Sequence, residues 1–126
     1  MHRRLVLQAF CAVMLALAVP AMAQPVRLTA AEVQALLSGN TIDGNWAGTA
    51  YQQFFNADGS TVFVLADGRR DEGRWRVNPD TNDYESWWRS TGWTPYAMVR
   101  TEAGGLAWIN GEQLEPFEVL PGRQME

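Results

Sequence analysis

A mainly β domain with one short N-terminal helix is the fold that this sequence predicts, and two patterns carry the prediction. From Asn40 onward, apolar and polar residues alternate with the two-residue period of strands. The alternating stretches recur about every ten residues, and Asp-Gly, Asn-Gly and Asn-Pro pairs separate them. We therefore expect an antiparallel meander that forms either a small barrel or a strongly curled sheet.

The helix is predicted from the stretch LTAAEVQALLSGNT. Thr29 can cap the N-terminus, and Glu32, three residues on, can reach back to it as a capping box. Gly39 is placed to end the helix. The apolar positions share one face at helical spacing: Val33, Leu36 and Leu37. So short a helix is marginal alone, and its apolar face must dock on the rest of the domain.

Seven strands are expected after the helix. They run over residues 46–55, 61–66, 72–77, 84–89, 96–101, 106–110 and 115–120. Turn-forming stretches such as NADGS, ADGRRD and NPDTND lie between them. No internal repeat and no linker is visible, so residues 24–126 are expected to form a single β-rich domain.

The hairpin around NPDTND can be given a register that starts at a Val77–Tyr84 pair. Four further pairs follow outward: Arg76–Glu85, Trp75–Ser86, Arg74–Trp87 and Gly73–Trp88. On one face, three aromatic residues are expected in the core: Trp75, Tyr84 and Trp88. Gly73 leaves room for the ring opposite. The other face gains an Arg76–Glu85 ion pair and a cation–π contact of Arg74 with Trp87. A slip of one residue would bury two arginines and a glutamate.

The first 23 residues have the pattern of a signal peptide. Arg3 and Arg4 precede the apolar run of residues 5–19, and Ala21-Met22-Ala23 supplies the small residues of a cleavage site. We expect cleavage after Ala23 and a periplasmic or secreted protein. The apolar run is shorter than the roughly 20 residues of a spanning helix, so no membrane span is expected after cleavage.

Several kinds of chemistry are excluded by composition. His2 and Cys11 are the sole histidine and cysteine, both lie before residue 24, and the chain has no lysine. We expect no metal site of the histidine or cysteine type, no cofactor and no disulfide. A histidine-dependent nucleophile is excluded as well. From residue 24 on, eight arginines face fourteen carboxylates, a net charge of −6, which disfavours nucleic acid as a partner.

A ligand site is expected from the aromatic residues near the stretch STGWTPY. Trp93 stands there between turn residues, where it either covers a barrel end or contacts a ligand. The four residues expected to line the open end are Tyr51, Trp93, Tyr96 and Trp108. A small apolar molecule or a carbohydrate would suit such a site. The leading hypothesis is therefore a non-catalytic periplasmic binding domain.

Two other functions are left open by the residues, and the oligomeric state is not predicted. One is an envelope interaction module that offers residues 111–126 as an exposed strand edge. The other, the least favoured, is an enzyme that uses carboxylates. No spacing of acidic residues singles out a catalytic pair.

Four stretches carry a resemblance to a known family: LTAAEVQALLSGNT, YQQFFNADGST, EGRWRVNPDTNDYESWW and FEVLPGRQ. They resemble a family of small, exported and uncharacterised bacterial proteins. The resemblance implies export and brings no catalytic residues with it. Some members carry the label dihydrodipicolinate reductase, which these residues do not support, because the chain has no G-x-G-x-x-G fingerprint for a nucleotide. Cysteines often follow the G-x-W strand in that family, and here Ser86 stands in such a place.

Overall fold

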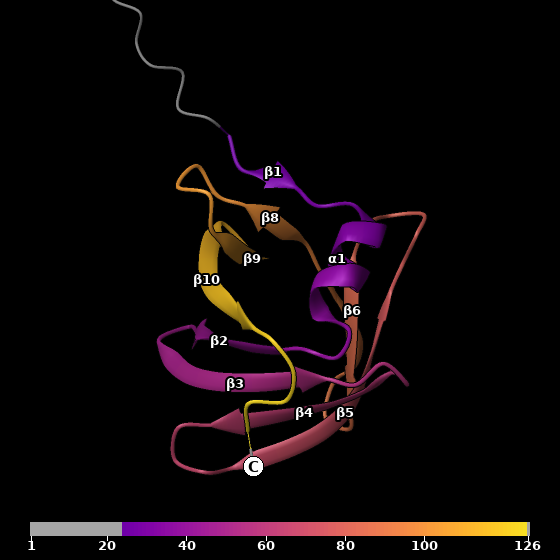
Figure 1. The fold of residues 1–126 in the computed structure, drawn as a ribbon, viewed down its shortest axis with the longest axis vertical. Helices are drawn as coiled ribbons and strands as arrows, with labels where there is room; N and C mark the ends of the chain where they lie inside the picture. Colours follow the sequence, from indigo (N-terminus) through magenta and orange to yellow (C-terminus); the bar gives the residue numbers. More distant parts are fainter. Residues whose placement is uncertain (1–23, 126) are drawn as a thin grey trace, which may run out of the picture.

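The computed structural model describes residues 24–125 and has one antiparallel sheet that curls into a half-barrel (Figure 1). The mainly β prediction is confirmed, in its curled-sheet form. The helix is α1 (Ala30–Leu37). The strands are β1 (Val26–Arg27), β2 (Thr41–Trp46), β3 (Thr49–Phe55), β4 (Ser60–Leu65), β5 (Arg70–Val77), β6 (Tyr84–Trp88), β7 (Gly92–Tyr96), β8 (Met98–Arg100), β9 (Leu106–Asn110) and β10 (Gln113–Leu120). The expected signal segment, residues 1–23, lies outside the described residues.

The strands follow the order β1-β8-β9-β10-β2-β3-β4-β5-β6-β7. Neighbours from β2 to β7 are consecutive in sequence, as a meander requires, and β10 then returns to pair with β2, with Phe117 opposite Gly44. At the other end, β7 runs into β8 through Ala97 alone. Ile109 donates its backbone N–H to the Ala97 carbonyl (3.0 Å). The two ends of the sheet are therefore close to each other, which gives the fold its curled shape.

Helix α1 begins and ends where the sequence predicts. Thr29 Oγ1 accepts the backbone N–H of Glu32 (3.3 Å), and Glu32 Oε1 accepts that of Thr29 (3.2 Å), which completes the capping box. Past the helix, Gly39 adopts a φ of 78°, the left-handed conformation that favours glycine. Val33 and Leu37 are fully buried and join the hydrophobic core.

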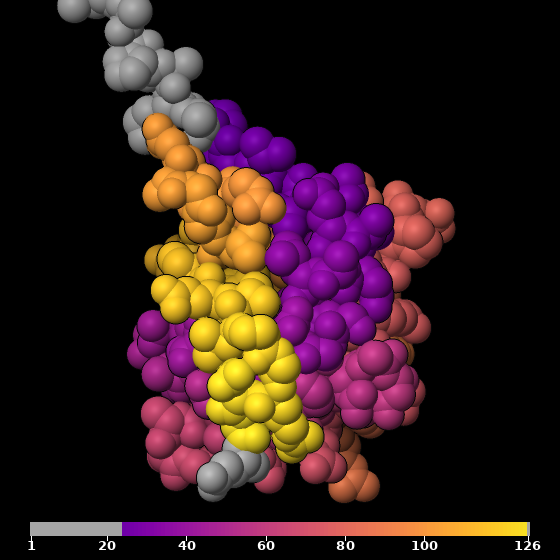
Figure 2. Space-filling model, viewed as in Figure 1, coloured from indigo at the N-terminus to yellow at the C-terminus, as the bar shows by residue number. Residues whose placement is uncertain are grey.

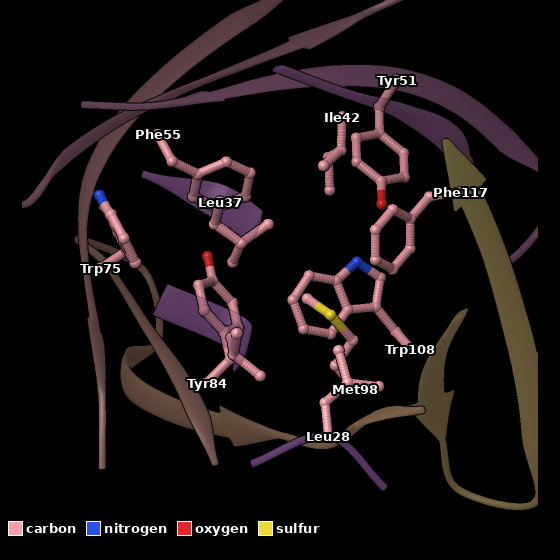
Figure 3. Close-up of a cluster of buried hydrophobic side chains, with 11 residues drawn as sticks. Leu28, Leu37, Ile42, Tyr51, Phe55, Trp75, Tyr84, Met98, Trp108 and Phe117 are labelled. Atoms are coloured by element: carbon pink, nitrogen blue, oxygen red, sulfur yellow. The ribbon is translucent and has the colours of Figure 1, made fainter. Parts of the chain in front are cut away.

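Helix α1 covers one opening of the curled sheet. In the space-filling view it lies between the C-terminal residues, in yellow, and the turn that follows β5 (Figure 2). Ala30 donates its backbone N–H to Asn82 Oδ1 in that turn (2.9 Å), and an Arg27–Asp83 ion pair lies beside it. The close-up shows Leu37 of the helix within the buried cluster (Figure 3). The covered end is thus packed with side chains.

The predicted strand over residues 46–55 contains β3 but begins too early, because two strands and a turn occupy residues 41–55. Ala47 and Gly48 both have positive φ, 48° and 86°, and they join β2 to β3. Strand β2 escaped prediction because the three residues in its middle, Asp43-Gly44-Asn45, are typical of turns. Its Gly44 is required by packing, since a Cβ there would lie 2.8 Å from Phe117 Cβ.

The predicted strand over residues 96–101 contains β8, and β7 forms where the sequence predicted a turn before that strand. Strand β7 contains Pro95, and proline argued against a strand there. The residue is tolerated because β7 is the last strand of the sheet, where one missing backbone N–H leaves no ladder partner unsatisfied. Trp93 therefore lies on a strand and not in the expected turn.

The predicted hairpin register is confirmed. Strands β5 and β6 pair Val77 with Tyr84, and the outward pairs follow as far as Arg74 with Trp87. Arg76 Nε lies 2.7 Å from Glu85 Oε1, the expected ion pair. The cation–π contact differs from the prediction, because Arg76 stacks over Trp93 (3.8 Å from Cζ to the ring centroid) and the described residues show no such contact between Arg74 and Trp87.

The segment that one hypothesis expected as an exposed edge contains β10, which pairs with β9 along residues 113–117 and with β2 along residues 117–120. Each half of β10 is thus paired on one side, and the use of this segment as an interaction edge stays a prediction. The strands at the ends of the sheet are β1 and β7. Among residues 24–125, no helix has the length and apolar character needed to cross a membrane.

Candidate functional site

A cavity of about 260 Å³ lies inside the curled sheet, away from the end that α1 covers. Strand β3 shows this placement, because Tyr51 near its start lines the cavity and Phe55 at its end packs in the core beneath the helix. The lining residues are Trp46, Tyr51, Gln53, Phe63, Asp71, Tyr84, Ser86, Trp88, Tyr96 and Trp108. We call this site the aromatic cavity.

The floor of the aromatic cavity is made of five buried residues. They are Tyr51, Gln53, Tyr84, Ser86 and Trp108, each at most 7% exposed. The rings of Tyr84 and Trp108 have centroids 4.7 Å apart, and Figure 3 shows the Tyr51 hydroxyl pointing toward the Trp108 indole nitrogen. Two-residue alternation turns Tyr51 and Gln53 of β3 inward, and likewise Tyr84 and Ser86 of β6. The floor is therefore fixed by the sheet.

The mouth of the aromatic cavity is formed by partly buried rings and one exposed carboxylate, Asp71. Trp46 and Tyr96 meet edge to face, with centroids 5.2 Å apart and planes at 85°. Phe63 and Trp88 meet in the same way at 6.0 Å and 68°. Each pair makes a corner of two aromatic rings, and such contacts hold the rings in place beyond the effect of area burial.

A network of hydrogen bonds supports the floor. Gln53 Nε2 donates to Thr61 Oγ1 (2.9 Å) and to the Tyr84 hydroxyl (3.2 Å). Trp88 Nε1 donates to Ser86 Oγ (3.2 Å). Both of these hydrogen bonds are donated by the side-chain nitrogen of Gln53. Within residues 24–125, no fully buried side-chain oxygen or nitrogen lacks a hydrogen-bond partner. The carbonyl oxygen of Gln53 is therefore reachable from the cavity and can accept a hydrogen bond.

The tyrosine hydroxyls around the cavity stay protonated at neutral pH. Burial raises the pKa of Tyr51 to about 12, a hydrogen bond with the Trp108 side chain acts in the opposite direction, and the charges of Glu115 and Asp43 raise it further. Burial likewise raises the pKa of Tyr84 and that of Tyr96. The lining thus consists of neutral groups, except for the carboxylate of Asp71.

Three of the four residues expected at the ligand site come together in the aromatic cavity: Tyr51, Tyr96 and Trp108. Trp93 does not join them. It is 39% exposed and lies under Arg76 on the outer face of β7, because residues three apart on a strand point to opposite faces. Of the residues expected in the core, Trp75 and Tyr84 are buried, and Trp88 is a partly exposed wall of the cavity.

Five lining residues were not predicted from the sequence: Trp46, Gln53, Phe63, Asp71 and Ser86. The alternation of Tyr51, Gln53 and Phe55 along β3 was a signal for the inward position of Gln53. Trp46 and Asp71 gave no such signal, because they stand at strand ends and reach the cavity through the curvature of the sheet.

Comparisons with protein-family models, with curated protein sequences and with solved structures return no match. Within residues 24–125, histidine, cysteine and acidic side chains do not gather in a group of three or more that could hold a metal ion. The geometry of the aromatic cavity is therefore the feature that bears on function.

Proposed function

We propose that the protein is a non-catalytic binding domain that holds a small ligand in the aromatic cavity. The observation that carries the proposal is the lining itself, in which seven of the ten residues are aromatic and the floor is fixed by a hydrogen-bond network. Concave, mostly apolar sites with a few placed polar groups are typical of small-molecule binding.

The size and polarity of the cavity favour a small ligand with an apolar body. Its volume of about 260 Å³ falls just below the roughly 300–1,000 Å³ of sites for drug-sized ligands. A carbohydrate needs many polar partners, but the Tyr84 hydroxyl and Ser86 Oγ already accept bonds from Gln53 and Trp88. Of the two ligand classes that the sequence suggested, the apolar one is better supported.

Two further observations support the place and the role that we propose. The signal-peptide pattern before residue 24 supports action in the periplasm or outside the cell. The lining contains a single carboxylate, Asp71, whereas acid–base hydrolysis of a glycoside uses two. Binding is therefore the simpler role for this cavity.

The proposal is tested by NMR titration of the purified protein with two small neutral apolar probes, benzene and indole. The indole N–H signals, assigned by tryptophan-to-phenylalanine variants, report on six sites. We expect saturable shifts for the cavity residues Trp46, Trp88 and Trp108, and none for Trp93. Shifts that fail to saturate for both probes, or that appear at Trp93 and not in the cavity, would contradict the proposal.

A matched pair of variants on β7 sharpens the test. Tyr96→Ala removes a ring from the mouth, whereas Trp93→Ala removes one from the outer face of the same strand. We expect about a tenfold or greater loss of probe affinity for the first variant and no change for the second. Equal losses in the two variants would mean that the cavity is not the binding site.

A further inference from the structure

We propose that the aromatic cavity recognises a small alkylated ammonium cation, with the rings at the mouth contacting the methyl groups and Asp71 supplying the opposite charge. This inference rests on the proposed binding function and names its ligand class. Three features carry it: the arrangement of the rings, the sign of the charges around them, and the scarcity of hydrogen-bond acceptors.

The rings at the mouth form two corners of the kind that surrounds a cation. In both the Trp46–Tyr96 pair and the Phe63–Trp88 pair, the ring planes lie at steep angles, 85° and 68°. A cation in such a corner meets the face of one ring and lies beside the next. Quaternary ammonium groups bind over aromatic faces within roughly 6 Å of the centroid, and several rings together make an aromatic cage.

The charged residue of the cavity lining is negative, and two further carboxylates act on the floor. Asp71 is the charged residue of the lining. Glu115, only 7% exposed, accepts hydrogen bonds from the Ala47 backbone N–H and from Asn110 Nδ2, both at 3.2 Å, and both donors are neutral. Glu115 and Asp43 both raise the pKa of Tyr51, so their field reaches the floor. A cationic ligand gains from this field, whereas an anionic ligand would be repelled.

The lining favours an alkylated ammonium over a primary one. A primary ammonium carries three N–H donors and is strongly hydrated. Aromatic walls would leave some of these donors without an acceptor, which is unfavourable in a buried site. A quaternary group has no N–H donor. The free carbonyl oxygen of Gln53 can then accept a hydrogen bond from a hydroxyl group elsewhere on the ligand.

The test compares choline with 3,3-dimethyl-1-butanol, its neutral isostere in which a carbon replaces the charged nitrogen. Affinities are measured by calorimetry and by the shifts of the cavity indole signals. We expect choline to bind about tenfold more tightly or better. Asp71→Asn should reduce this ratio severalfold. Asp80→Asn removes the same charge but should leave the affinity ratio unchanged, because Asp80 lies in the β5–β6 turn, at the end of the molecule that the helix covers.

Each outcome decides the inference. If the isostere binds as tightly as choline, the cation preference is refuted while the binding function stands. If Asp71→Asn and Asp80→Asn change the ratio equally, the effect comes from net charge and the role of Asp71 is refuted. If the isostere, benzene and indole bind but choline does not, the ligand class is wrong. If none of these probes binds, both the inference and the proposed function fail.

Discussion

Replacing Gly73 with alanine perturbs the contact on which both the hairpin and the cavity wall depend. A Cβ atom at this position would lie 2.2 Å from the backbone carbonyl oxygen of Trp87 and 2.7 Å from Cε3 of Trp88. The oxygen belongs to the main chain of β6 and cannot rotate away. Strands β5 and β6 must therefore move apart locally, and the Trp88 ring must shift out of its place beside the cavity.

The cost can be estimated from this overlap. Overpacking a well-packed site typically costs about 1–3 kcal/mol, and a clash with backbone belongs at the upper end, about 3 kcal/mol. In a domain of this size, each kcal/mol lowers Tm by about 4–8 °C, so we expect a fall of about 12 °C or more. With a urea m-value of about 1.5 kcal/mol/M, the unfolding midpoint should fall by about 2 M.

The assay is thermal unfolding followed by circular dichroism, together with urea unfolding followed by tryptophan fluorescence. Gly105→Ala is the matched control, because the nearest atom to its Cβ, Thr101 Oγ1, would be at the ordinary contact distance of 3.5 Å. We expect that control to stay within about 0.5 kcal/mol of the parent protein. A Gly73→Ala variant that melts within about 3 °C of the parent, or a control that loses as much, would refute the steric argument.

Three other predictions concern the core, the helix cap and the tyrosines. Phe55→Ala, at a fully buried ring, should cost about 3–5 kcal/mol in urea unfolding, and a cost below about 1 kcal/mol would be inconsistent with the packing. Hydrogen bonds from the Thr29 backbone and side chain lower the pKa of Glu32 from 4.5, so their contribution to stability is present above pH 4.5 and is lost as the pH falls through the lowered value. Thr29→Ala should cost about 1 kcal/mol at neutral pH and should make the urea midpoint depend less on acid pH. An unchanged pH dependence of the midpoint would count against the capping box. Burial raises the pKa of Tyr51 from 10 to about 12 and also raises that of Tyr84. The stability that comes from keeping these two hydroxyls protonated is complete below pH 10 and is lost as the pH rises toward 12. Tyrosinate absorbance should therefore rise together with unfolding, and titration of all tyrosines near pH 10 in the folded protein would disprove the burial effect.

The parts of the fold that could be predicted are those set by neighbours in the sequence. The β5–β6 register follows from the turn residues and the two-residue alternation, and the structure pairs Val77 with Tyr84 as expected. The capping box of α1 is equally local. The first hairpin was missed because its turn uses Ala47 before Gly48, without the Asn-Gly or Asp-Gly signal, and because glycine in β2 resembles a loop residue.

The candidate site could be predicted only in part, because it depends on which strands lie side by side. Tyr51 and Trp108 meet across β10 and β2, a pairing between distant parts of the chain that no local pattern specifies. The sequence predicts Trp93 in a turn, as a lid or as a ligand contact, because Gly92 and Pro95 flank it. The sheet end tolerates both residues, and strand alternation then turns Trp93 outward.

The pairing of β10 with β2 has a consequence for the order in which the protein folds. These strands join residues about 70 positions apart, such as Phe117 and Gly44, so a large loop must close before the sheet can curl. Strands β9 and β10 form a local hairpin, so the step that closes this loop is the pairing of β10 with β2, and until then β2 presents an unpaired edge. The meander from β2 to β7 and the β9–β10 hairpin can therefore form early, and we expect the binding site to arise when β10 pairs with β2.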